Sequence, residues 1–104
     1  MGVVVVRYKV KPGQVDANVE LVERVFARLH ADRPDGLRYA TFRLADGVSF
    51  VHVASVETPD GVNPLLGTAA FGAFQTDVAD RIEEGPFAMQ GTVIGSYGFP
   101  VEAG

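Results

Sequence analysis

The chain has 104 residues, of which 47% are hydrophobic and 21% charged. This composition fits one globular domain over residues 1–104 and excludes a disordered chain. Its net charge is −4, whereas nucleic-acid binding calls for a basic surface, so we expect no nucleic-acid partner. There are no cysteines, which excludes disulfides and thiolate metal sites. The first apolar run is too short for a signal peptide or a membrane span, so we expect a cytoplasmic protein without membrane contact.

The first two expected elements are a strand and a helix. Residues 3–10 are mostly valine with two basic interruptions, a composition typical of a strand. From Gln14 to Asp32 the apolar residues recur every three or four positions, which predicts an amphipathic helix. This apolar stripe comprises Val15, Val19, Val22, Val25, Phe26 and Leu29.

A hairpin is predicted next, with strands over residues 37–44 and 48–57. The Asp46-Gly47 dipeptide between them favours a two-residue type I′ turn, which needs positive φ at both positions. That turn sets the register, and residues that face each other share one face of the sheet. The expected pairs are Ala45 with Val48, Arg43 with Phe50, Thr41 with His52, and Tyr39 with Ala54.

A second helix and a last strand complete the chain. The helix is expected from Leu65 or Thr68 to Glu84, ended by Gly85-Pro86. Its apolar stripe is Phe71, Phe74, Val78 and Ile82. The last strand is expected over residues 91–99, followed by a tail to residue 104.

These elements predict an α+β domain of β-α-β-β-α-β order. Both faces of its antiparallel sheet look apolar, yet two helices can cover only one of them. The simplest cover for the other face is the same face of a second copy, so a homodimer is expected.

Several local patterns together resemble the antibiotic biosynthesis monooxygenase-like branch of the dimeric α+β barrel superfamily. The similarity covers about residues 3–99. It rests on four stretches: the strand that runs into Lys11-Pro12-Gly13, the Asp46-Gly47 hairpin followed by residues 50–53, the segment Thr68 to Phe74 with its two phenylalanines, and Gly85-Pro86.

This resemblance implies a ferredoxin-like subunit that forms a dimeric α+β barrel. It also implies a small-molecule activity such as cofactor-independent oxygenation of polycyclic phenols, so we expect no cofactor. The sequence departs from the family pattern where it has Ala54, Val56 and Ala70 in place of a Glu, a Trp and a His. Without any tryptophan, the Asn-Trp-His arrangement of the haem-degrading members cannot be present.

His52 is the candidate catalytic residue. It lies in the middle of a strand, and its imidazole could act as a general base toward a phenol or an acidic C–H bond. The alternative is a buried neutral histidine that is hydrogen-bonded to Thr41 or to the backbone. The other histidine, His30, ends the first helix, where a cation suits the helix dipole. Two distant histidines without carboxylates at ligand spacing predict no metal site.

Candidate substrate-binding residues surround His52 in the predicted sheet and second helix. Hydroxyl groups could orient a ligand, a guanidinium could hold an anionic oxygen, and aromatic rings could form a wall. The alternative is that the aromatic residues are plain core and the arginine is a solvated edge residue. The candidates are Tyr39, Thr41, Arg43, Phe50, Phe71, Phe74 and Tyr97.

Two functions follow from these residues. One is a monooxygenase-like enzyme that acts on a small aromatic or enolisable molecule. The other is a non-catalytic dimeric protein of the same fold that binds a small molecule or serves an accessory role. Haem binding is a weaker option, because the predicted second helix contains no histidine as an axial ligand.

Overall fold

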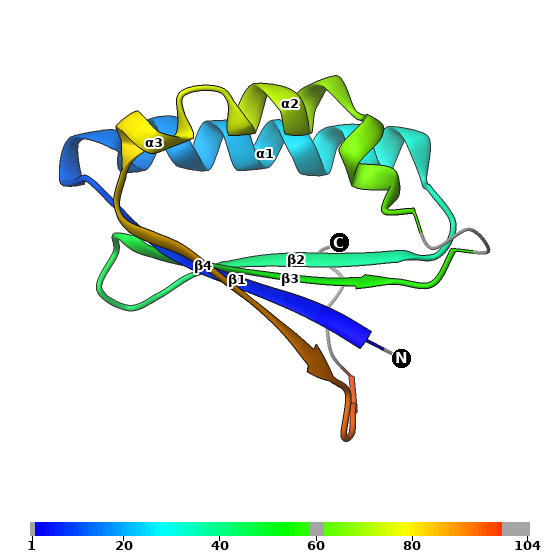
Figure 1. The fold of residues 1–104 in the computed structure, drawn as a ribbon. Coiled ribbons are helices and arrows are strands. Elements are labelled where there is room, and N and C mark those ends of the chain that lie inside the picture. The colour runs from blue at the N-terminus through cyan, green and yellow to red at the C-terminus, as the bar shows by residue number, and fades with distance from the viewer. Residues whose placement is uncertain (1, 59–61, 99–104) are drawn as a thin grey trace.

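The computed structural model describes residues 2–58 and 62–98, which form one antiparallel sheet with the helices packed on one face (Figure 1). The four strands are β1 (Gly2–Val10), β2 (Leu37–Arg43), β3 (Ser49–Val56) and β4 (Ile82–Thr92). The helices are α1 (Val15–Asp32), α2 (Ala69–Gln75) and α3 (Val78–Arg81), with 3₁₀ turns η1 (Pro12–Gln14) and η2 (Pro64–Gly67). No described helix is long and apolar enough to cross a membrane.

The strand order is β2-β3-β1-β4, with every neighbouring pair antiparallel. This order, together with the alternation of strands and helices, confirms the predicted ferredoxin-like fold. The two halves of the chain interleave, because β1 lies in the middle of the sheet between β3 and β4. Residues from both ends of the sequence therefore meet in one core.

The predicted hairpin register is confirmed, although the turn differs from the expected type. Arg43 pairs with Phe50, Thr41 with His52, and Tyr39 with Ala54, whereas the predicted pair of Ala45 with Val48 lies beyond the end of the ladder. Gly47 has a positive φ of 79°, but Asp46 does not, so the turn is not type I′. Instead the Asp46 carboxylate accepts hydrogen bonds from the backbone amides of Val48 and Ser49 at 3.0 and 2.8 Å. The Leu44 amide donates to the Ser49 carbonyl oxygen at 2.8 Å, which closes the loop in the predicted register.

The second helix and the last strand were predicted wrongly at their junction. The predicted single helix is two helices, α2 and α3, because the chain leaves the helical conformation at Thr76 and at Asp77, which has a φ of 59°. α3 ends at Arg81 and β4 begins at Ile82, so residues 82–90 belong to a strand that the sequence pattern placed in a helix and a loop. Gly85-Pro86 lies within β4 and does not end a helix. Gly85 has a φ of 95°, and a Cβ there would lie 2.9 Å from the Arg7 carbonyl oxygen. Close passage of the two strands at a register shift explains this glycine.

Of the predicted last strand, residues 91 and 92 belong to β4, and residues 93–98 are not in a strand. Phe99 and the predicted tail lie outside the described residues. Among the described strands β4 pairs with β1 alone and is an edge strand, and edge strands tolerate glycine and proline better than central ones.

The hydrophobic core lies between the helices and the inner face of the sheet. The inner face is the one that carries His52 and Tyr39, and it alone is covered by helices (Figure 1). Val10 is fully buried and Phe50 is 2% exposed, while Val25 of α1 packs against them. The remaining core residues are Tyr8, Leu65, Phe74 and Ile82.

No helix of the described residues lies against the outer face of the sheet. This face carries the side chains that alternate with the inner set, both apolar and basic: Val3, Val5, Arg7, Lys9, Arg38, Ala40, Phe42, Ser49, Val51, Val53, Ser55, Phe87 and Met89. Phe87 and Met89 are 57% and 75% exposed.

Candidate functional site

His52 is the centre of a buried polar cluster beneath the helices. β3 directs it inward, where it is 6% exposed. The Tyr8 hydroxyl lies 2.7 Å from its Nε2 atom. The Tyr39 hydroxyl and the Thr41 Oγ1 lie 2.5 and 3.1 Å from its Nδ1 atom. Both ring nitrogens therefore have protein partners, and three strands hold the ring in one orientation.

The cluster continues from Tyr8 into the helices. Asn18 of α1 is fully buried and donates from Nδ2 to the Tyr8 hydroxyl at 3.0 Å. Arg81 of α3 donates from Nε to Asn18 Oδ1 at 3.3 Å. Its other nitrogens donate to the carbonyl oxygens of Phe74 and Thr76. A hydrogen-bonded line thus runs from Arg81 through Asn18 and Tyr8 to His52, and then to Tyr39 and Thr41. We call these six residues the His52 network.

Aromatic rings enclose the histidine. Tyr8 stacks on it with ring centroids 5.2 Å apart, and Phe74 is tilted against it at 5.5 Å. Tyr39 is itself stacked on Phe26 of α1 at 5.1 Å. These contacts exclude water from the ring and leave its hydrogen bonds in an apolar surrounding, where they are stronger than in water.

A largely apolar pocket of about 260 Å³ opens beside this network. Tyr8, Tyr39 and His52 of the network form part of its wall. The other lining residues are Val4, Val6, Ala54, Asn63, Leu65, Phe71, Phe74, Gln75, Val78, Ile82 and Pro86. An apolar cavity with a few convergent polar groups is the usual form of a small-molecule site.

Burial sets the protonation states of the network. It lowers the pKa of His52 to about 4, so the imidazole is neutral at neutral pH. It raises the pKa of both tyrosines to about 12, so both phenols keep their protons. For Tyr8, the hydrogen bond from Asn18 and the charge of Arg81 oppose this rise in pKa.

The structure brings together only some of the residues predicted to bind a substrate. Tyr39, Phe71 and Phe74 line the pocket with His52. Thr41 is within hydrogen-bond distance of His52 Nδ1 and does not line the pocket. Arg43 is exposed at the end of β2, as the solvated-edge alternative has it. Phe50 lies in the core, stacked on Tyr8. Tyr97 is 99% exposed beyond β4.

Three network residues were missed in the sequence, although each carries a signal. Asn18 and Arg81 are polar residues at positions that the helical stripes assign to the core, three or four residues from Val15, Val22 and Val78. Tyr8 alternates with Val6 and Val10 on the inner face of β1. A buried polar residue needs a partner, so an amide or a guanidinium in an apolar stripe points to a network.

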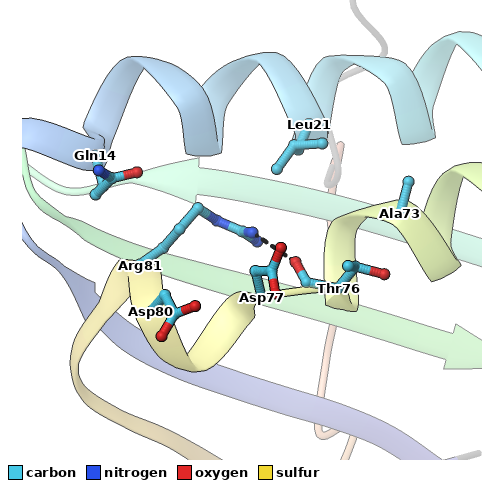
Figure 2. Close-up of a pocket in the computed structure, with 7 residues that line it drawn as sticks. All are labelled: Gln14, Leu21, Ala73, Thr76, Asp77, Asp80 and Arg81. Carbon is cyan, nitrogen blue, oxygen red and sulfur yellow. Dashed lines mark hydrogen bonds between the residues drawn. The ribbon is translucent and has the colours of Figure 1, made fainter.

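A second hollow, of about 450 Å³, lies outside the core between α1 and the α2–α3 turn (Figure 2). Figure 2 shows the Arg81 side chain extending into this gap with its guanidinium directed at Thr76, while Leu21 reaches down from α1. Asp77 and Asp80 border the hollow. No group of three or more His, Asp or Glu side chains in residues 2–58 and 62–98 is arranged to hold a metal ion.

Comparison with known proteins gives a clear result for the fold. No family model and no curated protein sequence matches the chain. Solved structures do match over most of its length. One is a protein from Nitrosomonas europaea named as an antibiotic biosynthesis monooxygenase, with a TM-score of 0.76 and 22% identity, covering 91% of this chain and 100% of that one.

Two further structures bear the same name. The protein from Caulobacter crescentus CB15 has a TM-score of 0.72 and 18% identity over 90% of each chain. The one from Chloroflexus aurantiacus J-10-fl has a TM-score of 0.69 and 12% identity over 93% of this chain and 96% of that one. The resemblance inferred from the sequence is thus confirmed for the fold, which this chain shares with proteins of that name.

Proposed function

We propose that the protein is a cofactor-independent monooxygenase-like enzyme that acts on a small aromatic or enolisable molecule bound beside His52. The observation that carries this proposal is a neutral imidazole held between two tyrosines that both line an apolar pocket. Burial lowers the pKa of His52 to about 4, so the proposed proton uptake from an acidic ligand depends on the ligand anion stabilising the imidazolium that forms. The phenols can hydrogen-bond this anion. The fold shared with proteins named as monooxygenases supports the same reaction class.

The proposed oxidation needs few groups from the protein. Once the ligand is deprotonated, its carbanion is electron-rich enough to react with O₂ directly. Oxidation of a ligand CH₂ group by one O₂ then gives a carbonyl group and one water, so no further reductant is needed. The protein supplies the pocket, the proton acceptor and the groups that stabilise the anion.

The experiment is an oxygen-uptake assay with a panel of polycyclic phenols and enolisable ketones. We expect His52→Ala to abolish uptake while circular dichroism stays unchanged. His30→Ala is the matched control, because this exposed residue lies at the far end of α1, and it should retain full activity. Equal activity of wild type and His52→Ala would remove the catalytic role of His52.

A second function, non-catalytic binding, is favoured by one specific observation. Both nitrogens of His52 already have partners within the protein itself, which is also how a purely structural histidine is satisfied. Saturable binding of a panel compound, seen by calorimetry without oxygen uptake, would support this alternative.

The proposal includes a homodimer formed through the outer face of the sheet. The strands β1 and β3 contribute half-buried valines to this face, and Phe87 and Met89 of β4 extend it as exposed side chains. The Ser55 hydroxyl is buried on the same face, and no partner for it lies among the described residues. A second copy would cover the apolar side chains, as expected for a two-fold symmetric interface.

A further inference from the structure

The donor and the acceptor of each hydrogen bond in the His52 network can be assigned in turn, starting from Arg81. A guanidinium has only donors, so the Asn18 atom facing Arg81 Nε must be the amide oxygen. This fixes the orientation of the Asn18 side chain and turns its NH₂ group toward Tyr8. Arg81 is 5% exposed, and each of its two terminal nitrogens donates to a carbonyl oxygen of α2 or the α2–α3 turn.

The same reasoning assigns the donor and the acceptor of the hydrogen bond between Tyr8 and His52. The Tyr8 oxygen accepts the hydrogen bond from Asn18, and its single hydrogen cannot point back at an NH₂ group. The other partner of this hydroxyl is His52 Nε2 at 2.7 Å, which must therefore accept. A neutral imidazole with a lone pair on Nε2 carries its hydrogen on Nδ1.

The hydrogen on Nδ1 of His52 in turn determines what the Tyr39 hydroxyl can donate to. The Nδ1 hydrogen faces the oxygens of Tyr39 and Thr41 at 2.5 and 3.1 Å, so these oxygens accept. The Tyr39 hydroxyl then keeps its own hydrogen for another acceptor. Thr41 also hydrogen-bonds Tyr39, and because this bond lowers the pKa of Tyr39, Thr41 is its donor. The hydrogen of Tyr39 is therefore left for an acceptor in the pocket, which Tyr39 lines.

We propose that Arg81 is a positioning residue that, through Asn18 and Tyr8, fixes His52 as the Nδ1–H tautomer and so makes Tyr39 the hydrogen-bond donor of the pocket. This inference rests on the proposed function in taking that pocket as the ligand site. It narrows the ligand class to molecules that present an acceptor oxygen to Tyr39, such as a phenolate, an enolate or a ketone.

The two tyrosines then have opposite roles. A proton leaving the ligand reaches His52 through Tyr8, whose oxygen accepts it while its own hydrogen moves to Nε2. His52 becomes an imidazolium, the ligand becomes an anion, and Tyr39 donates to that anion. Proton and charge are conserved in this step, and no further reactant takes part.

The test is ¹⁵N NMR of the histidine rings in the ligand-free protein, at a pH above the titration range of histidine. In the wild type we expect a protonated, pyrrole-like Nδ1 and a pyridine-like Nε2 for His52. The variant Asn18→Asp keeps the side-chain shape and the contact with Arg81 but cannot donate to Tyr8. Tyr8 should then donate to the new carboxylate, and the two nitrogens of His52 should exchange their signatures.

Tyr39→Phe is the matched control, because it removes a partner of Nδ1 and leaves the line from Arg81 to Nε2 intact. Its tautomer should stay Nδ1–H. A wild-type ring protonated on Nε2, or N18D retaining the Nδ1–H pattern, would overturn the inference. The wild-type spectrum decides even if N18D fails to fold. Since no turnover is measured, this failure is distinct from that of the oxygen-uptake assay.

Discussion

Arg81 and Asn18 are 63 residues apart in the sequence, yet Nε of the arginine donates to the side-chain oxygen of the asparagine at 3.3 Å inside the protein. No carboxylate in the described part of the chain lies within ion-pair distance of this guanidinium. Carbonyl oxygens, the amide oxygen and the face of the Phe74 ring surround it instead, with the ring centroid 5.3 Å away. The buried cation is therefore held by dipoles and an aromatic ring.

Removing this cation should destabilise the fold strongly. Arg81→Met leaves three oxygen acceptors, two of them buried, without their donor, so we expect the free energy of unfolding to fall by about 3 kcal/mol. Arg28→Met is the control, because Arg28 is exposed and pairs with Asp32 on the surface of α1, where such pairs contribute under about 1 kcal/mol. Urea denaturation measures both changes, and similar losses would contradict the assigned role of Arg81.

Acid should destabilise the protein through His52. The pKa of His52 is about 4 in the folded state, against an ordinary value of 6.5, so between these values the unfolded chain binds more protons than the folded one. Stability is then fully present above pH 6.5 and falls as the pH drops toward 4, by about 3 kcal/mol in total.

Urea denaturation across this pH range measures the effect of His52. His52→Gln should remove this part of the pH dependence while other acid-sensitive groups remain. An unchanged slope in the variant would show that His52 does not titrate as proposed.

Gly36 should tolerate no side chain. Its φ is 81°, and a Cβ there would lie 2.5 Å from the Glu57 carbonyl oxygen, where β2 begins beside the end of β3. We expect Gly36→Ala to lower the free energy of unfolding by about 2 kcal/mol. Gly13→Ala is the control, because a Cβ at Gly13 would have no other atom within 4 Å, and its effect should stay within about 1 kcal/mol. Equal thermal midpoints for the two variants would contradict this account.

The outer face of the sheet should respond to a single charge. Met89→Glu places a carboxylate in the proposed interface, and we expect native mass spectrometry to show a monomer where the wild type is a dimer. Leu66→Glu is the control, since Leu66 is 65% exposed in η2 on the helical side, and it should leave the dimer intact. A wild-type monomer would refute the dimer itself.

Local patterns in the sequence were sufficient for most of the fold. The hairpin register followed from the position of Asp46-Gly47, and it placed Tyr39 and Thr41 with His52 correctly. The length of the first helix followed from its apolar stripe. β4 could not be found in this way, because glutamates, glycine and proline disfavour strands. Its pairing with the exposed edge of β1 overrides that local preference.

The candidate site was only half visible in the sequence for a related reason. His52 and Tyr39 share a hairpin, so a local turn brings them together. Asn18, Tyr8 and Arg81 come from three separate elements, and their contacts depend on how α1 and α3 pack on β1. No short-range pattern encodes that packing.

The His52 network also bears on how proteins with this pocket could diverge. Its members belong to five different elements and are part of the buried layer, so a change at any of them alters stability as well as chemistry. Much of the pocket wall consists of side chains outside the network, among them Val4, Ala54 and Phe71. Substitutions at these apolar positions can therefore change which ligand fits while the His52 network stays the same. Ligand specificity and reactivity can then evolve separately.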